Sequence, residues 1–425
     1  MQTLYQKLTF PNGLRLLLAE NHKSPTFTVL VLVEAGLKYE TKAENGISHF
    51  LEHMCFHGTK KRPSALAISS ELDGIGAYYN AFTGNEYTGY FIKSHRGHFN
   101  HVLDVISDIY LRSLFDPQTI EREKGVVIEE SNRSDDNPSH KIADSFMRLL
   151  YGNQPAGWKI LGEIHNIRKF NRNDFISYHK KHYRAKSTVV VISGDFSKKE
   201  AVHLIKEKFA EISSGKGIIK KKVVECQKKP AFSFERKKIE QARFILGFRG
   251  VDLKSPLRFP VEILVNILGG SMSSRLFEKI RNQMGATYDI STDQDNFTDH
   301  GIIATSAGIE ISKLEKVLLA VLDEHKAIAQ KGVNKEELVK AKEHLKGRLT
   351  LSLETSNAIA GFLGSQEILL KKILSPKDIF RKINAVSQKQ IQDVARKFFV
   401  PRNLNLAVLG PYRSKKDFEA LLRKF

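Results

Sequence analysis

The sequence has few cysteines and no long apolar run. Its 425 residues include two cysteines, Cys55 and Cys226, which cannot build a disulfide framework and lie in no paired-cysteine metal motif. We expect Cys55 to be a small buried hydrophobic residue. The sequence contains no stretch of about 18 apolar residues, so no transmembrane helix is predicted. Residues 1–18 indicate a strand, a turn and a strand, without the apolar core or the cleavage site of a secretory signal. We therefore expect a cytoplasmic protein without a membrane partner.

Acidic residues are outnumbered by basic ones. The chain has 67 Lys and Arg against 47 Asp and Glu, which gives a formal charge of +20. Such a charge would suit a nucleic-acid binder or an enzyme with acidic substrates. The lysines are spread over the whole chain, however, and the densest group, between residues 216 and 229, falls in a probable linker. We therefore predict a dispersed basic surface and no nucleic-acid partner.

The strongest local pattern is His49-Phe50-Leu51-Glu52-His53, inside residues 45–59. An α-helix turns by about 100° per residue, so His49 and His53 share a face and Glu52 lies about 60° from His49. Two imidazoles and a carboxylate on one face suit a divalent metal with a general base beside it. The order His-x-x-Glu-His is the inverzincin signature. The pattern predicts a zinc peptidase in which Glu52 is the base.

A third ligand is needed, because catalytic zinc usually takes three protein ligands and keeps one position for water. The acidic helical stretch 121–130 is the richest source of candidates. Glu123 and Glu130 are two turns apart and share a face, whereas Glu129 lies about 100° away from Glu130. We predict Glu130 as the ligand and Glu123 as a residue that orients a ligand or restrains water. Glu129 remains the alternative.

The two halves of the chain end alike. Each has a helix, a basic link, a buried strand and a glycine, Gly194 or Gly410, about half the chain apart. Duplication predicts two α+β domains of one fold, residues 1–212 and 231–425, joined by a basic linker at 213–230. Two unrelated domains with a shared ending remain the alternative. The repeat places Ser273 and Phe277 at the positions of His49 and His53, which predicts a single metal site.

Residues 49–59, followed by Glu130, resemble the M16 peptidases, which include pitrilysin, insulin-degrading enzyme and mitochondrial processing peptidase. The resemblance covers nearly the whole chain, through segments 80–83, 160–162, 187–194 and 274–277 and the pair Arg281 and Tyr288. It implies Glu130 as third ligand, one zinc ion per chain, and duplicated α/β-sandwich domains of the LuxS-like metallopeptidase fold, each a mostly antiparallel sheet covered by helices. His57 and Cys55 depart from the usual family pattern.

The same resemblance implies a zinc endopeptidase that acts on oligopeptides or unfolded segments inside a clamshell chamber, with the zinc-bound water activated by Glu52. It assigns oxyanion stabilisation to Tyr288 and a substrate carbonyl to Arg281. It also implies an edge strand at Asn80, Ala81 and Phe82 onto which a peptide substrate adds. Chains of this length in the family pair, so a homodimer or a heterodimer with a related chain is expected. The alternative is a non-catalytic or heterodimeric partner subunit, and the choice between processing and scavenging of peptides stays open.

Overall fold

The computed structural model describes residues 5–215, 217–412 and 418. The outermost residues of both predicted domains lie outside the described residues. The chain forms two compact units. The first unit comprises Met1–Arg133, Trp158–Lys221 and Leu351–Ser375, and the second comprises Ser134–Gly157, Lys222–Thr350 and Pro376–Phe425. Within the described residues no helix combines the length and the apolar character needed to cross a membrane.

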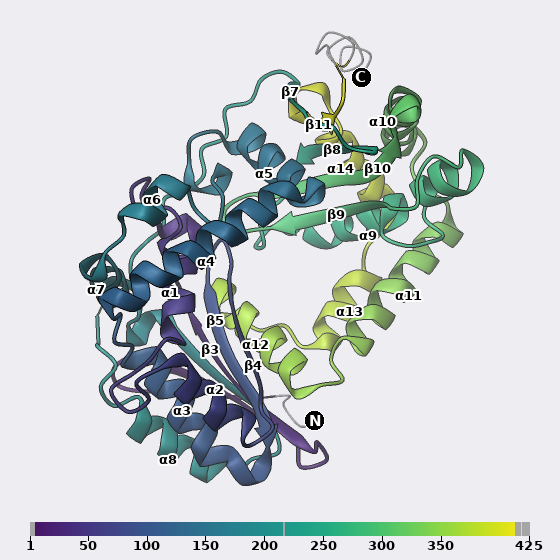
Figure 1. Cartoon of the computed structure of the whole chain (residues 1–425). Helices are drawn as coiled ribbons and strands as arrows, with labels where there is room; N and C mark the ends of the chain where they lie inside the picture. Colours follow the sequence, from purple (N-terminus) through teal and green to yellow (C-terminus); the bar gives the residue numbers. More distant parts are fainter. Residues whose placement is uncertain (1–4, 216, 413–417, 419–425) are drawn as a thin grey trace. The chain divides into compact units, whose positions relative to one another are not determined.

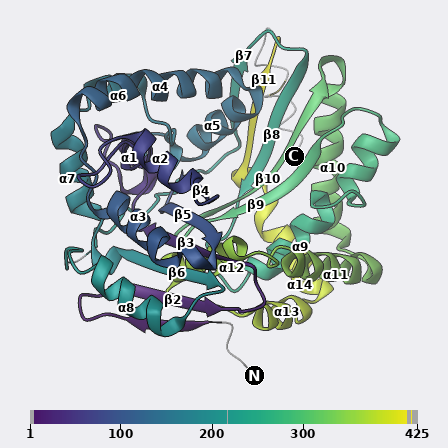
Figure 2. The ribbon, with the colours of Figure 1, turned by 60° about the horizontal axis from the view of Figure 1, so that its bottom comes forward.

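A six-stranded sheet forms the centre of the first unit (Figure 2). Its order is β1-β2-β6-β3-β5-β4, and β2 runs parallel to β6 whereas the other neighbours are antiparallel. The strands are β1 (Gln6–Thr9), β2 (Arg15–Glu20), β3 (Thr26–Val33), β4 (Tyr78–Thr83), β5 (Thr88–His95) and β6 (Thr188–Gly194). The apolar run of β3 is typical of a strand buried on both faces, and β3 lies inside the sheet.

A five-stranded sheet forms the centre of the second unit. Its order is β7-β11-β8-β10-β9, with β7 parallel to β11 and the other neighbours antiparallel. The strands are β7 (Ala231–Arg236), β8 (Gln241–Arg249), β9 (Ile290–Asn296), β10 (Gly301–Glu310) and β11 (Leu404–Gly410). Apart from the extra β1, strand order and direction match those of the first sheet. This match confirms the predicted α+β fold with duplicated domains.

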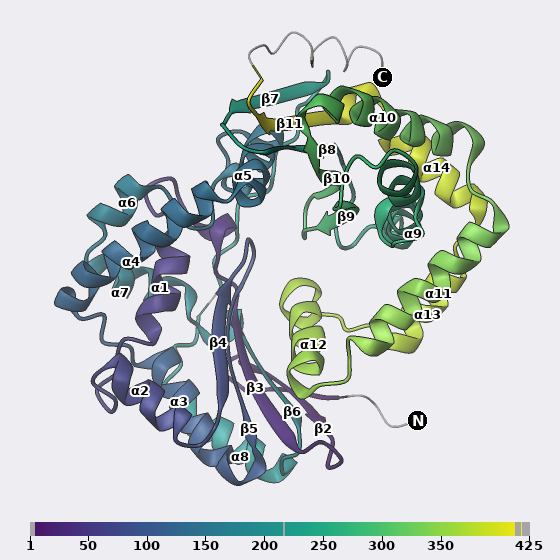
Figure 3. The ribbon, with the colours of Figure 1, turned by 45° about the vertical axis from the view of Figure 1, so that its right-hand side comes forward.

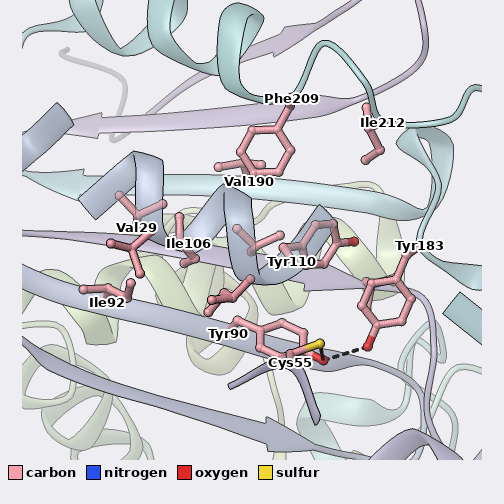
Figure 4. Packing of buried hydrophobic residues seen from close by; sticks show 14 of the residues in the cluster. Val29, Cys55, Tyr90, Ile92, Ile106, Tyr110, Tyr183, Val190, Phe209 and Ile212 are labelled. Carbon is pink, nitrogen blue, oxygen red and sulfur yellow. Dashed lines mark hydrogen bonds between the residues drawn. The ribbon is translucent and has the colours of Figure 1, made fainter. Parts of the chain in front are cut away.

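Helices cover both faces of the first sheet (Figure 3). Alternation along β3 sends Val29 and Val31 into the core formed with α1 (Ile47–Cys55) and α3 (Phe99–Leu111), whereas Leu30 and Leu32 face α12 (Ser356–Leu370). Figure 4 shows the core around Val29, in which Cys55 lies against Tyr90. The remaining helices of this unit are α2 (Ala65–Asp73), α4 (Pro117–Asp136, whose last residues belong to the second unit), α6 (Ile164–Lys169), α7 (Arg172–His182) and α8 (Lys198–Lys208).

The second sheet is covered in the same way. One face packs on α9 (Arg258–Gly269), α10 (Leu314–Lys331) and α14 (Gln388–Phe398). The other face packs on α5 (Pro138–Tyr151) (Figure 1). Ile142 and Phe146 of α5 belong to the same buried cluster as Ile245 and Ala407 of the sheet. Two further helices, α11 (Lys335–Leu351) and α13 (Pro376–Asn384), and a π-helical segment, Phe277–Gln283, complete the second unit.

The units differ from the predicted domains by an exchange of helices. Helix α5 comes from the first half of the sequence but covers the second sheet, and α12 comes from the second half but covers the first sheet. Each sheet has a second apolar face that must be removed from water, and a helix from the other half buries it. The change of unit between Lys221 and Lys222 falls inside the predicted linker.

One local prediction is wrong. Along the chain α9 follows β8 as α1 follows β3, and the segment Phe277–Gln283 stands in the place of α2. Ser273 and Phe277 therefore do not correspond to His49 and His53, because the glycine-rich turn before Ser273 resembles the start of α1 without occupying its place.

Candidate metal centre

The start of α1 is held by a close approach of two glycines. Gly46, the residue before the helix, has φ +100°, and Gly162 on a distant loop has φ +81°. A Cβ atom on Gly46 would lie 2.8 Å from the Cα of Gly162, so a side chain at either position would push the loop away. The glycines therefore allow the loop at 160–162 to pack against the first turn of α1.

A buried carboxylate, Glu40, receives the free amide groups at the start of α1. Its oxygens accept hydrogen bonds from the backbone N–H groups of Gly46 and Ser48, at 2.9 Å each, and from the side chain of Asn45 at 3.1 Å. Burial raises the pKa of Glu40 to about 7, although these hydrogen bonds act in the opposite direction. Sequence reasoning missed Glu40, because it caps the helix from outside the local capping pattern.

His49, His53 and Glu130 converge between α1 and α4. Glu130 Oε2 lies 3.7 Å from His49 Nε2 and 3.5 Å from His53 Nε2. One ligand atom from each residue lies within 4.8 Å of the others, and within the described residues this is the one group of three or more potential ligands. Glu129 is exposed and does not belong to the group.

The geometry and the donor types of this group fit a zinc ion. The distances from Glu130 to the imidazoles are too long for hydrogen bonds. They are close to the ~3.3 Å that separates neighbouring ligand atoms around a tetrahedral zinc with bonds of about 2.0–2.1 Å. Burial, helped by the neighbouring His53, lowers the pKa of His49 to about 4, so its imidazole is neutral and can offer a lone pair at neutral pH.

Glu123 holds the ring of His53 from behind. Its Oε1 lies 2.9 Å from His53 Nδ1, and its Oε2 lies 3.1 Å from Nε2 of His57. Burial alone would raise the pKa of Glu123, but the hydrogen bonds from the two histidines hold it at about 2. An ionised carboxylate on Nδ1 directs Nε2 of His53 towards Glu130. His57, which departs from the family pattern, is thus a second partner of Glu123.

Glu52 is half-buried beside these residues. It accepts a hydrogen bond from the hydroxyl of Thr83, the last residue of β4. Burial raises the pKa of Glu52, and the charge of Glu130 adds to this effect, whereas Thr83 and His53 oppose it. A carboxylate with a raised pKa is suited to accept a proton and to return it. Sequence reasoning assigned no role to Thr83, since nothing local connects a strand residue to a base 31 positions earlier.

The segment assigned to substrate binding lies on the edge strand β4. Asn80, Ala81 and Phe82 alternate between exposed and half-buried positions, and 39% of Phe82 is exposed. Among the described strands β4 pairs with β5 alone, so its other edge carries unpaired backbone groups. The side chain of Asn80 accepts a hydrogen bond from the Ala81 N–H at 2.8 Å.

Arg281 and Tyr288 belong to the second unit, where they line one pocket together with Glu240, Gln241 and Glu310. The guanidinium of Arg281 lies 4.7 Å from the centre of the Phe277 ring. Tyr288 is 82% exposed. The structure brings these two residues together within their own unit.

Two family models match the chain. Residues 15–163 match the model described as insulinase, peptidase family M16, and residues 169–345 match the model described as the peptidase M16 inactive domain. The first range contains His49, Glu52, His53 and Glu130, and the second contains Arg281 and Tyr288.

Curated relatives match along almost their whole length. A zinc protease of Bacillus subtilis (strain 168), YmxG, described as uncharacterized, is 33% identical over 96% of this chain and 98% of its own. A zinc protease of Rickettsia bellii, also described as uncharacterized, is 31% identical over 94% of this chain and 96% of its own.

Solved structures share the two-domain fold. A protease from Helicobacter pylori superposes with a TM-score of 0.88 at 21% identity, over 96% of this chain and 99% of that one. A structure from Pseudomonas fluorescens, titled peptidase M16 inactive domain, gives a TM-score of 0.89 at 20% identity with the same coverage.

Proposed function

The chain belongs to the M16 family of peptidases, and on this premise we propose that it is a zinc-dependent endopeptidase that hydrolyses oligopeptides or unfolded segments. The observation that carries the proposal is the convergence of His49, His53 and Glu130 with the carboxylate of Glu52 beside them. Two histidines and a glutamate are a donor set of catalytic zinc. The names of the relatives, which call them zinc proteases, support the same metal and reaction.

The residues of the first unit divide the chemistry between them. His49, His53 and Glu130 would hold one zinc ion, and Glu123 would keep His53 in the orientation that presents Nε2. When bound, zinc supplies Lewis acidity, which makes water a stronger acid and a peptide carbonyl more electrophilic. Glu52 would take a proton from the attacking water and later deliver it to the leaving amine.

The free edge of β4 is the proposed peptide site. An extended peptide can add to such an edge as a further strand, through its backbone. The Ala81 N–H would give up its hydrogen bond to the Asn80 side chain and donate to a substrate carbonyl instead. The side chains of Asn80 and Phe82 would contact side chains of the peptide. Recognition through the backbone suits a broad range of unfolded peptides.

Arg281 and Tyr288 would complete the reaction from the second unit. Arg281 would bind a substrate carbonyl, and the Tyr288 hydroxyl would donate a hydrogen bond to the oxyanion that forms on the attacked carbonyl. The exposure of Tyr288 and the shared pocket support this assignment. We further propose a second chain, identical or related, as partner, which a mass measurement in solution tests.

A second candidate is a non-catalytic partner subunit. The match of residues 169–345 to an inactive-domain model favours it, since that part of the chain carries no ligand group within the described residues. The first unit, however, retains the three ligands and the base. The two candidates differ in what purified protein does to unfolded peptides.

Replacement of the base tests the proposal. Glu52→Gln keeps the shape of the side chain but cannot take a proton, so hydrolysis of a quenched fluorescent peptide should fall by about 100-fold or more while zinc remains bound. Glu129→Gln, on the exposed side of α4, is the matched control and should leave turnover unchanged. Full turnover by Glu52→Gln, or no hydrolysis by the zinc-loaded wild type, would contradict the proposal and favour the partner subunit.

A further inference from the structure

Thr83 connects the edge strand to the base. Along β4, the side chains of Tyr78, Asn80 and Phe82 are exposed, whereas those of Tyr79, Ala81 and Thr83 are half-buried on the face that meets α1. This alternation is the two-residue period of a strand. It directs the Thr83 hydroxyl towards α1, where it donates its hydrogen bond to Glu52 Oε2.

The turn after Thr83 is fixed to the body of the first unit. The backbone N–H of Leu37 donates to the carbonyl of Gly84 at 3.2 Å, and that of Lys38 donates to the carbonyl of Asn85 at 2.8 Å. The buried ammonium of Lys38 lies 3.2 Å from the buried carboxylate of Glu86. With its turn held at several points, Thr83 offers Glu52 a hydroxyl in a constant position.

The backbone of Thr83 also faces the free edge of the strand. The N–H of Gly84 donates to the carbonyl of Tyr87, which makes these two residues a hydrogen-bonded pair. Hydrogen-bonded and non-bonded pairs alternate along an antiparallel ladder, so Thr83 and Ala81 belong to non-bonded pairs with Thr88 and Tyr90. Their N–H and C=O groups therefore point to the edge where a peptide would add.

We propose that Thr83 is a positioning residue that aligns Glu52 with a peptide bound along β4. This inference rests on the proposed function, in which Glu52 is the base. The backbone of Thr83 would contact the peptide while its hydroxyl holds Oε2 of Glu52, so that Oε1 is the oxygen that takes the proton. Without the hydroxyl, the carboxylate would turn about its terminal bond and accept the proton from a less favourable direction.

The inference is tested by a substitution that removes the hydroxyl of Thr83 but keeps the shape of its side chain. Valine matches threonine in size and branching, and serine keeps the hydroxyl. We expect Thr83→Val to lower kcat by about 10- to 100-fold, as for loss of a hydrogen bond to a charged group, with KM nearly unchanged. Thr83→Ser should retain most of kcat. The matched control is Thr88→Val on β5, opposite Thr83, whose hydroxyl donates to the Ala35 carbonyl at 3.1 Å and does not reach Glu52.

Two measurements other than turnover separate positioning from binding and folding. Zinc content per chain should be the same in wild type, Thr83→Val and Thr88→Val. In the Glu52→Gln background, which would bind without cleaving, Thr83→Val should leave the peptide Kd unchanged by fluorescence anisotropy.

Several results would overturn the inference. A wild-type kcat in Thr83→Val would contradict it, and so would a loss of kcat in Thr83→Ser or Thr88→Val as large as that in Thr83→Val. Loss of zinc from Thr83→Val would also contradict it. So would a peptide affinity that Thr83→Val weakens by as large a factor as it lowers turnover. Full activity of Glu52→Gln is a different result, because it refutes the proposed function itself.

Discussion

The first and second units share a strand order but differ at one helix. In the first unit, α1 carries His49, which is buried, and Glu52 and His53, which are half-buried. In the second unit, α9 occupies the same place between the central strand and the edge strand and is buried to the same extent, with nine of its twelve residues buried against seven of nine in α1. Helix α9 has no histidine. The comparison shows that the fold provides a place for a metal helix, whereas the side chains decide whether a metal binds.

The two helices also begin differently. Glu40 receives the amide groups at the start of α1, whereas Leu257 precedes α9 and makes no side-chain hydrogen bond to it. The amide groups at the start of a helix have no partner within the helix, and in the first unit the carboxylate of Glu40 supplies one for α1.

The largest difference between the units should appear when a ligand is removed. His53→Ala should reduce bound zinc from about one ion per chain to about none after dialysis and abolish peptide hydrolysis, because two ligands hold zinc weakly. The control is His344→Ala, a histidine of the second unit whose Nδ1 lies 2.8 Å from the side chain of Asn266 on α9. Metal analysis of both variants makes the test. Loss of zinc from His344→Ala would contradict the assignment of the metal to the first unit alone.

A smaller effect is expected from the residue that orients the ligand. Glu123→Gln should weaken zinc binding by about 10- to 100-fold, since the amide cannot serve as a charged acceptor for both His53 and His57. Glu121→Gln is the control on the same helix, because Glu121 is exposed and pairs with Lys124 at 2.7 Å. Competition with a chromophoric chelator measures both affinities, and equal values would show that Glu123 has no influence on the metal.

The buried carboxylate at the start of α1 predicts a pH dependence of the stability of the fold. The pKa of Glu40 is raised from 4.5 to about 7 in the folded chain, chiefly by burial, so the folded state binds this proton more tightly than the unfolded state. The stabilisation is complete below about pH 4.5 and is lost as the pH rises through about 7. Urea unfolding should show the wild type losing up to about 3 kcal/mol relative to Glu40→Ala over this range.

A nearby carboxylate gives the opposite sign and serves as the control. Burial alone would raise the pKa of Glu44, but hydrogen bonds from Thr41 and the charge of Lys181 lower it below 4.5. Its contribution to stability is present above pH 4.5 and is lost as the pH falls. The stability gap between wild type and Glu44→Ala should therefore close towards acid, and a pH slope of the same sign for both variants would contradict the assignment.

The smallest effect concerns the two thiols, one in each unit. Cys55, the last residue of α1, is buried, and burial raises its pKa to about 12, whereas Cys226 is exposed. The thiolate is the reactive form, so a maleimide should label one cysteine per native chain. Cys226→Ser should abolish labelling and leave peptide turnover unchanged. Labelling of native Cys226→Ser would show that the core around Cys55 opens readily.

Much of the candidate site could be predicted from local periodicity. The spacing of His49 and His53 puts both on one turn of a helix, and the seven-residue spacing of Glu123 and Glu130 puts both on one face of α4, where the structure brings them to the two histidines. Periodicity was insufficient for α9, because an apolar helix without ligands resembles any core helix. The glycine-rich turn before Ser273, by contrast, resembles the turn before the motif helix, so sequence similarity favours the wrong counterpart.

The sequence by itself determined the duplication and the motif helix, because each of them is a repeat or a phase within a continuous stretch. Helical phase favoured Glu130 as the third ligand but left Glu129 open, and the structure groups Glu130 with the two histidines. Tertiary structure alone decided three features: the exchange of α5 and α12 between the sheets, the carboxylate of Glu40 at the start of α1, and the hydroxyl of Thr83 on the proposed base. Each of these features joins residues from different elements. Such contacts form only when apolar faces pack, and no local pattern records which polar groups then meet.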